Sequence, residues 1–290
     1  MIKIMTDASA DIETSVAKEL GIEVLPFMIH LGDKQIRADI DYQPEEYYEE
    51  LKSTEDMPST SQMSPADVED VYRRLGAEGD SIIHVSISSC GSGIYNTASF
   101  VAQQLNEEGM DITVVDSKTF SYLIGNAVIE AAKMAKDNCT KEEILEFLEN
   151  HFQMYNAYFV VDDLTFLQKG GRIKATTMAI SSILDIKPIL TVSDGLVEAY
   201  KKVRGLKKAI SILAGYVEER MEDPESGEIV ILHSEALDKV EILTSMIVAK
   251  TGNKNIKLRS IGPIITSHAG MQLVGIMFKH KEPWEKYEKK

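Results

Sequence analysis

Short apolar runs alternate along the chain with longer segments in which apolar residues recur every three or four positions. In the first half, the short runs predict strands at residues 3–6, 23–31, 82–87 and 112–115, with residues 35–38 pairing back as a hairpin. The periodic segments predict helices at residues 11–20, 44–52, 65–75, 94–105, 123–136 and 141–152. Ser9 or Asp11 is placed to cap the first of these helices, and Gly21 is placed to end it. Residues 53–64 show no periodicity, which predicts a loop. This alternation indicates a mainly parallel sheet flanked by helices.

The second half of the chain has a different pattern, with more strands per helix. Strands are predicted at residues 157–161, 187–192, 196–203, 228–233, 256–261 and 273–278, and helical segments at 163–167, 175–184, 206–221 and 236–250. Ser193-Asp194-Gly195 between two of the strands predicts a hairpin. A length of 290 residues exceeds the usual size of one domain. We therefore predict an α/β protein with an N-terminal, mainly parallel α/β domain at residues 1–160. A C-terminal α+β domain with a mixed sheet is predicted at residues 161–290.

Composition and charge narrow the classes of function. The chain has 31 basic and 46 acidic residues, a net charge of −15, which argues against nucleic acid and anionic membranes as partners. Cys90 and Cys139 form no CxxC pattern, so neither a disulfide nor a zinc site is expected. No apolar run reaches the roughly 18 residues of a membrane span, and the chain opens directly into a strand. A cytoplasmic protein without integral membrane association is the resulting expectation.

The segment Ser88–Gly93 is the main candidate for binding chemistry. It is a small, hydroxyl-rich loop between a predicted strand and a predicted helix. Glycines allow a sharp turn, and the following helix offers free N–H groups, so the loop is suited to an anion. The chain contains no GxxxxGK[ST], GxGxxG, HExxH or GxSxG motif in the required context, so no cofactor, metal or phosphate loop is predicted.

Other polar positions each have a functional and a structural interpretation. Residues 6–7 and 116–117 follow predicted strands, where they either bind a ligand or cap the next helix. The three hydroxyls of residues 59–61 and the amide of Gln62 either bind an oxyanion or form local turns. Gly170-Gly171-Arg172 either clamps an anion or is a helix stop with a solvated arginine, and the helix stop is favoured. Ser92 with His268 as its base remains an alternative, as in a serine hydrolase or acyltransferase.

Seven segments, in this order, resemble motifs of the DegV family of bacterial fatty-acid-binding proteins, and the likeness spans about residues 3–280. The segments are TDASAD at 6–11, TSQMS at 60–64, SSCGSGIYNTA at 88–98, LQKGGRI at 167–173, IKPIL at 186–190, VRG at 203–205 and GPIITSHAG at 262–270. Each motif is weak by itself, whereas the ordered set is specific.

The resemblance implies a carrier, not an enzyme. It implies a long-chain fatty acid such as palmitate in a buried tunnel, with no cofactor besides this ligand and a role in lipid transport or fatty acid metabolism. The family positions that hold the carboxylate correspond to Thr60 and Ser92. Positions near the head group correspond to Ser61, Gly93, Arg204 and His268. Some family members present the acid to a fatty acid kinase. Gly91 stands where the family has leucine, which removes a side chain that could line the cavity.

Overall fold

The chain forms two compact units. A computed structural model describes residues 1–38, 43–178 and 186–287. The first unit contains Met1–His151 with Gly262–Ile264, and the second contains Phe152–Ile261 with Ile265–Lys290. The sequence placed the division after residue 160, whereas the structure assigns strand β8 (Tyr155–Val160) to the second unit, because β8 pairs with strands of that unit.

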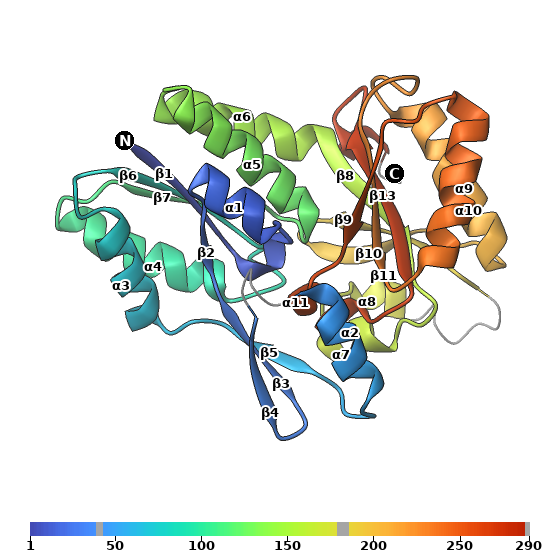
Figure 1. Cartoon of the computed structure of the whole chain (residues 1–290), viewed down its shortest axis with the longest axis horizontal. Helices are drawn as coiled ribbons and strands as arrows, with labels where there is room; N and C mark the ends of the chain where they lie inside the picture. Colours follow the sequence, from blue (N-terminus) through green and yellow to red (C-terminus); the bar gives the residue numbers. More distant parts are fainter. Residues whose placement is uncertain (39–42, 179–185, 288–290) are drawn as a thin grey trace. The chain divides into compact units, whose positions relative to one another are not determined.

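A parallel sheet forms the centre of the first unit, as predicted. Its strands run in the order β2-β1-β6-β7 and all pair in parallel. They are β1 (Ile2–Asp7), β2 (Glu23–Leu25), β6 (Ser81–Ser86) and β7 (Ile112–Asp116). The helices are α1 (Thr14–Leu20), α2 (Pro44–Lys52), α3 (Pro65–Leu75), α4 (Ile94–Glu107), α5 (Tyr122–Lys136) and α6 (Lys141–Met154). Helix α5 packs on β1 and β6, and α4 packs on β7 (Figure 1).

Two predictions for residues 23–64 of the first unit, one of a strand and one of a loop, were wrong in detail. The strand predicted for residues 23–31 is interrupted at Pro26, which has no N–H to donate to a ladder. After it, β3 (Phe27–Leu31) joins a separate sheet of order β4-β3-β5, with β4 at Lys34–Ala38 and β5 at Ser59–Ser61. The predicted loop at residues 53–64 therefore contains a strand. Strand β5 is polar throughout, so apolar periodicity does not reveal it, and its order comes from antiparallel pairing with β3.

The start of α1 also differs from the prediction. Neither Ser9 nor Asp11 caps it, because Ala8–Ala10 form a short 3₁₀ turn (η1) and α1 begins at Thr14. Asp11 has a left-handed backbone with φ of 52°, and its carboxylate accepts a hydrogen bond from the Ser121 hydroxyl. Gly21 ends α1 in a left-handed conformation, as predicted.

A mixed sheet of order β10-β9-β8-β13-β11-β12 forms the second unit, as predicted. Only β11 and β12 are parallel among the paired strands of its described residues. These strands are β9 (Ile189–Ser193), β10 (Leu196–Lys201), β11 (Ile229–Ser234), β12 (Ile256–Ser260) and β13 (Leu273–Lys279). The helices are α7 (Thr165–Gly170), α8 (Ala175–Met178), α9 (Leu206–Arg220), α10 (Leu237–Thr251), α11 (Pro263–Ala269) and the 3₁₀ turn η2 (Trp284–Tyr287).

Helices α9 and α10 pack against each other and on the sheet (Figure 1). The predicted loop at 262–270 contains α11, whose Pro263 suits a first helical turn. Residues 179–185 of the helix predicted at 175–184 lie outside the described residues.

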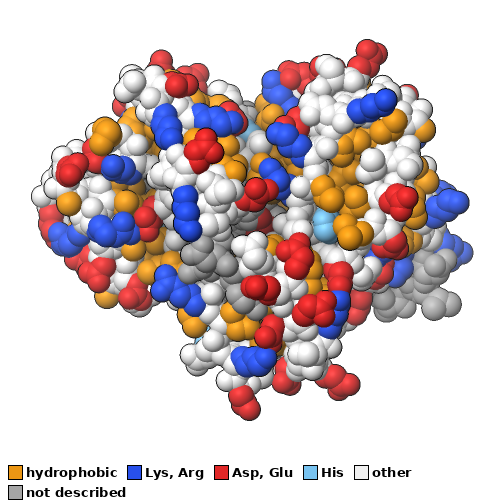
Figure 2. All heavy atoms as spheres, in the orientation of Figure 1, with side chains coloured by type: hydrophobic (Ala, Val, Ile, Leu, Met, Phe, Trp, Pro, Cys, Tyr) orange, Lys and Arg blue, Asp and Glu red, His pale blue; other side chains and the backbone are white. Residues whose placement is uncertain are grey.

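Charges on the surface are mixed in sign. On the face drawn in Figure 2, acidic and basic side chains are interspersed, with hydrophobic side chains between them. Several form exposed ion pairs, such as Arg73 with Glu69 and Lys133 with Glu130, which contribute little to stability. Of the helices in the described ranges, none combines the length and the apolar composition needed to cross a membrane.

Two helical glycines predict opposite effects of substitution by alanine. A Cβ at Gly125 in α5 would overlap the carbonyl oxygen of Ala10, whereas a Cβ at Gly215 in α9 would meet no atom within 4 Å. We expect Gly215→Ala to raise the free energy of unfolding by about 0.4–1 kcal/mol. Gly125→Ala should lower it by about 1–3 kcal/mol, because α5 must move away from η1. Urea denaturation measures both, and equal shifts of the same sign would contradict the assigned packing.

Candidate functional site

The loop Ser88–Gly93 is a tight turn between β6 and α4. The N–H groups of Gly91 and Ser92 both donate to the carbonyl of Ser88, at 2.9 and 3.0 Å. The Ser88 N–H donates in turn to the carbonyl of Thr119 at 3.1 Å. Ser88 is fully buried, while Ser92 is partly exposed. The loop therefore has an anchored base and presents Ser92 close to the N-terminus of α4.

Two carboxylates brace this loop, from the ends of β1 and β7, the strands on either side of β6. Asp116, at the end of β7, accepts from the N–H of Ser89 at 3.1 Å and from its hydroxyl at 2.6 Å. Asp7, at the end of β1, accepts from the N–H of Ile87 at 2.9 Å and from the N–H of Ser9 at 3.1 Å. The sequence left these residues as ligand groups or helix caps. The structure uses both to hold the backbone of the loop.

Burial dominates the electrostatics of Asp7. The side chain is fully buried, and burial raises its pKa, although the Ile87 N–H and the Ser9 hydroxyl act in the opposite direction. The adjacent Thr6 hydroxyl is buried with no hydrogen-bond partner among the described residues. This end of β1 is thus shielded from solvent, and such a site favours neutral over charged side chains.

The segment that contains Thr60 is tied to the start of α4. Thr60 lies in β5 opposite Ile29, and the Ser61 hydroxyl is 2.9 Å from His30 Nε2. Gln62 follows and donates through Nε2 to the Thr97 hydroxyl in the first turn of α4, at 2.7 Å. A Cβ at Gly93 would lie only 2.8 Å from Gln62 Oε1, so the Gln62 side chain approaches Gly93 closely and would have to shift if position 93 had a side chain.

These contacts bring the strand that carries Thr60 and the loop that carries Ser92 to the same helix start. The Ser92 hydroxyl itself accepts the N–H of Ile94 at 3.4 Å. The sequence offered the amide of Gln62, beside the hydroxyls of residues 59–61, either as an oxyanion ligand or as part of a local turn, and the structure places this amide on Thr97 of α4.

Asp11 is a further carboxyl of the first unit that the sequence did not select as a site residue, and its Oδ1 atom is buried although the residue is partly exposed. Burial raises its pKa to about 7, against hydrogen bonds from the Ser121 hydroxyl and the Gly262 N–H, and the negative charge of Asp7 raises it further. Gly262 can lie this close because it has no Cβ, which would overlap Asp11 Oδ1. Segment 262–264 is thereby held in the first unit.

The second unit holds the remaining predicted residues. His268 lies in α11, and a Cβ at Gly170 of α7 would be 2.8 Å from His268 Nδ1. Burial, with a smaller contribution from the charge of Arg172, lowers the pKa of His268 to about 4. Arg172 was expected to be solvated, but it is half-buried and its guanidinium donates to the Gly170 carbonyl. Arg204 is exposed, and its backbone bridges to Ile186.

A buried lysine holds the segment before α7 and the segment after α11, the helices beside Arg172 and containing His268. Lys239 in α10 is 4% exposed. Its Nζ donates to Asp162 at 2.8 Å and to the carbonyl and side-chain oxygens of Gln272 at 2.9 and 3.0 Å. Asp162 precedes α7 and Gln272 follows α11, so one ammonium group fixes both segments.

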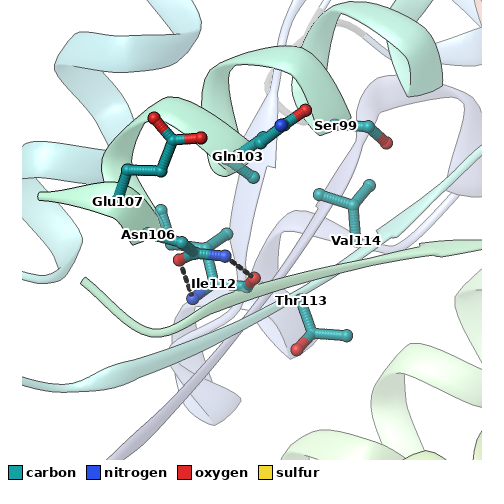
Figure 3. Close-up of a pocket in the computed structure, with 8 residues that line it drawn as sticks. Ser99, Gln103, Asn106, Glu107, Ile112, Thr113 and Val114 are labelled. Atoms are coloured by element: carbon teal, nitrogen blue, oxygen red, sulfur yellow. Dashed lines mark hydrogen bonds between the residues drawn. The ribbon is translucent and has the colours of Figure 1, made fainter. Parts of the chain in front are cut away.

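A separate surface pocket of about 560 Å³ lies in the first unit, between α4 and β7 (Figure 3). It is lined by Ser99, Ala102, Gln103, Asn106, Glu107, Ile112, Thr113 and Val114. Asn106 is engaged with the backbone of Ile112 through two hydrogen bonds of 2.8 Å. None of these lining residues is a predicted site residue, and none is a cation that would favour a carboxylate.

Comparison with known proteins agrees with this architecture. A family model described as uncharacterised proteins of the DegV family matches residues 1–281. A DegV domain-containing protein of Clostridium perfringens is 34% identical over 287 residues, covering 97% of this chain and 98% of the relative. One of Caldanaerobacter subterraneus is 33% identical, covering 97% and 99%.

Solved structures show the same fold. A fatty acid binding DegV family protein from Streptococcus agalactiae has a TM-score of 0.86 at 28% identity, covering 96% of this chain and 98% of that one. DegV from Bacillus subtilis, a fatty acid binding protein, has a TM-score of 0.81 at 26% identity, covering 95% and 98%. The two units and their loops thus define a protein with the DegV architecture. The chain belongs to the DegV family.

Proposed function

We propose that this protein binds a long-chain fatty acid, such as palmitate, in a buried tunnel, with Thr60 and Ser92 at the carboxylate. The observation that carries the proposal is the contact of Gln62 with Thr97 and Gly93, which holds the Thr60 segment at the helix start beside Ser92. Similar structures from S. agalactiae and B. subtilis are described as fatty-acid binding. Ser61, Gly93, Arg204 and His268 are the proposed neighbours of the head group.

The free energy of binding comes from the acyl chain. Burial of one methylene is worth about 0.8 kcal/mol, so about 14 methylenes provide on the order of 11 kcal/mol before the costs of association. The head group needs donors, because an unpaired buried carboxylate is expensive. Two hydroxyls and the N–H groups at the start of α4 meet that need without reacting with the carboxylate.

The protein is proposed to act as a carrier in lipid transport or fatty acid metabolism. It would work in the cytoplasm and present the carboxylate to a fatty acid kinase. The alternative of a serine hydrolase, with Ser92 as nucleophile and His268 as base, is less well supported. A histidine with a pKa of about 4 is a weak general base at neutral pH.

Mass spectrometry of an organic extract tests the proposal, with about one fatty acid per chain expected. Ser92→Ala and Thr60→Ala should each raise the dissociation constant of palmitate about tenfold or more, since each removes a hydrogen bond to the charged carboxylate. Displacement of a fluorescent fatty acid measures the change. Ser99→Ala, in the pocket between α4 and β7, is the control and should keep the wild-type affinity. An empty extract together with no uptake of added palmitate would exclude a carrier.

A further inference from the structure

Gly91 and Phe120 form a pair in which the ring fills the space of the missing side chain. Phe120 lies between β7 and α5, and Gly91 lies in the loop Ser88–Gly93. A Cβ at Gly91 would be 2.8 Å from Phe120 Cζ and still closer to Cε1. A side chain at position 91 would therefore require the ring to move. The ring occupies the space that such a side chain would take.

The residues on both sides of Phe120 are held by hydrogen bonds. On one side, the Thr119 carbonyl accepts from the Ser88 N–H at 3.1 Å, and the Thr119 N–H donates to the Ser117 hydroxyl at 3.3 Å. On the other side, the Ser121 hydroxyl donates to the carboxylate of Asp11. The chain on both sides of Phe120 is thus fixed beside the loop, which limits how far the ring can move.

The position of the ring places it next to the proposed carboxylate site. Gly91 precedes Ser92, and consecutive Cα atoms are about 3.8 Å apart, so the ring lies about one residue from the proposed carboxylate ligand. Gly91 is buried, whereas Phe120 and Ser92 are both partly exposed. A hydroxyl beside an exposed aromatic surface matches the amphipathic end of a fatty acid, with its charged carboxylate next to apolar methylenes.

We propose that Phe120 contacts the first carbons of the acyl chain and that the Gly91–Phe120 pair is a specificity determinant. It selects straight-chain acids against acids with a substituent at C2. A methyl group at C2 would require the space of the ring, and such overpacking is costly. The inference rests on the proposed function, because it needs Ser92 at the carboxylate.

The test is the ratio of the dissociation constants of 2-methylhexadecanoic acid and palmitic acid. We expect a ratio of at least ten for the wild-type protein and a ratio at least fivefold lower for Phe120→Ala. The double variant Gly91→Leu/Phe120→Ala should return the ratio toward the wild-type value, since leucine refills the space. Phe100→Ala on α4, where the ring is 58% exposed, is the matched control and should leave the ratio unchanged.

A purely structural role of Phe120 would weaken both acids equally, and an unchanged ratio in Phe120→Ala would overturn the inference while the proposed function stands. If Phe120→Ala does not fold, Phe120→Leu replaces it, with a lower ratio again expected and an unchanged one again decisive. A wild-type protein that fails to bind palmitate would overturn both the proposed function and this inference.

Discussion

Replacement of Asp7 by alanine is expected to lower the free energy of unfolding by about 3 kcal/mol and to weaken fatty acid binding. Its carboxylate accepts three hydrogen bonds, from the Ile87 N–H and from the N–H and hydroxyl of Ser9. Alanine leaves these donors in a buried site without an acceptor, at about 1–3 kcal/mol each. Relief of the buried carboxyl, whose pKa is raised by burial, offsets part of the cost.

We expect weaker fatty acid binding because Asp7 holds the Ile87 N–H, and Ile87 immediately precedes the loop that carries Ser92. Urea denaturation and palmitate titration measure the two effects. Asp70→Ala is the control, since Asp70 is exposed on α3, and should change stability by less than about 0.5 kcal/mol. Asp7→Asn should fall between the two, because its amide oxygen can still accept the Ile87 N–H. A stability of Asp7→Ala equal to that of Asp70→Ala would contradict the bracing role.

Acidification is expected to destabilise the second unit steeply. Burial lowers the pKa of His268 and of His280 from 6.5 to about 4. Because the folded-state pKa lies below the unfolded value, the unfolded state binds protons first as the pH falls. The contribution of these two histidines to the free energy of unfolding is fully present above about pH 6.5 and is lost as the pH falls from 6.5 to about 4. Each group contributes about 1.36 kcal/mol per pH unit, so the two together give about 2.7 kcal/mol per unit.

The first unit should respond less to acid, because its shifted groups oppose one another. Burial lowers the pKa of His84 to about 3, so this residue also destabilises the unit as the pH falls. Burial raises the pKa of Asp11 to about 7 and that of Asp7 above its ordinary value. These carboxyls hold protons in the folded state that the unfolded state releases above about pH 4. Their contribution to stability therefore grows as the pH falls from about 7, against that of His84.

Hydrogen exchange followed by mass spectrometry at several pH values separates the two units. His280→Gln should halve the pH dependence of the second unit and leave that of the first unchanged. Measurements at pH 7.5, where the histidines are neutral in both states, correct for the lost contact of His280 with the Tyr158 hydroxyl at 3.1 Å. A second unit whose stability does not change between pH 6.5 and 4 would show that these histidines are not buried as described.

Local features of the sequence were enough to predict most helices and strands. Helix α3 begins at Pro65 as predicted, and Ser64 and Asp67 form a capping box within its first turn. Helix α2 spans Pro44–Lys52 as predicted, because Pro44 suits the first turn of a helix. The polar strand β5 and the short helix α11 were missed. Strand β5 exists only through its pairing with β3, more than twenty residues earlier in the chain.

In the candidate site, too, some residues were predicted from the sequence, whereas the contacts between distant segments were found only in the structure. The ordered motifs were sufficient to assign the DegV family and to select Thr60 and Ser92. They did not show that Gln62 ties the Thr60 segment to Thr97, or that Asp7 holds Ile87 across 80 positions. Gly91 looked like an open position in the sequence, and the structure fills it with the ring of Phe120.

The sequence by itself determined the α/β class, the parallel and mixed sheets and the family of this protein. These follow from apolar periodicity, caps and motifs, each of which acts over a few neighbouring residues. Only the tertiary structure decided which carboxyls brace the loops and which have a raised pKa, since burial raises the pKa of Asp11 to about 7 while its partner Ser121 lies 110 positions away. Burial and hydrogen-bond partners depend on contacts between distant segments, and spacing along the chain does not encode them locally.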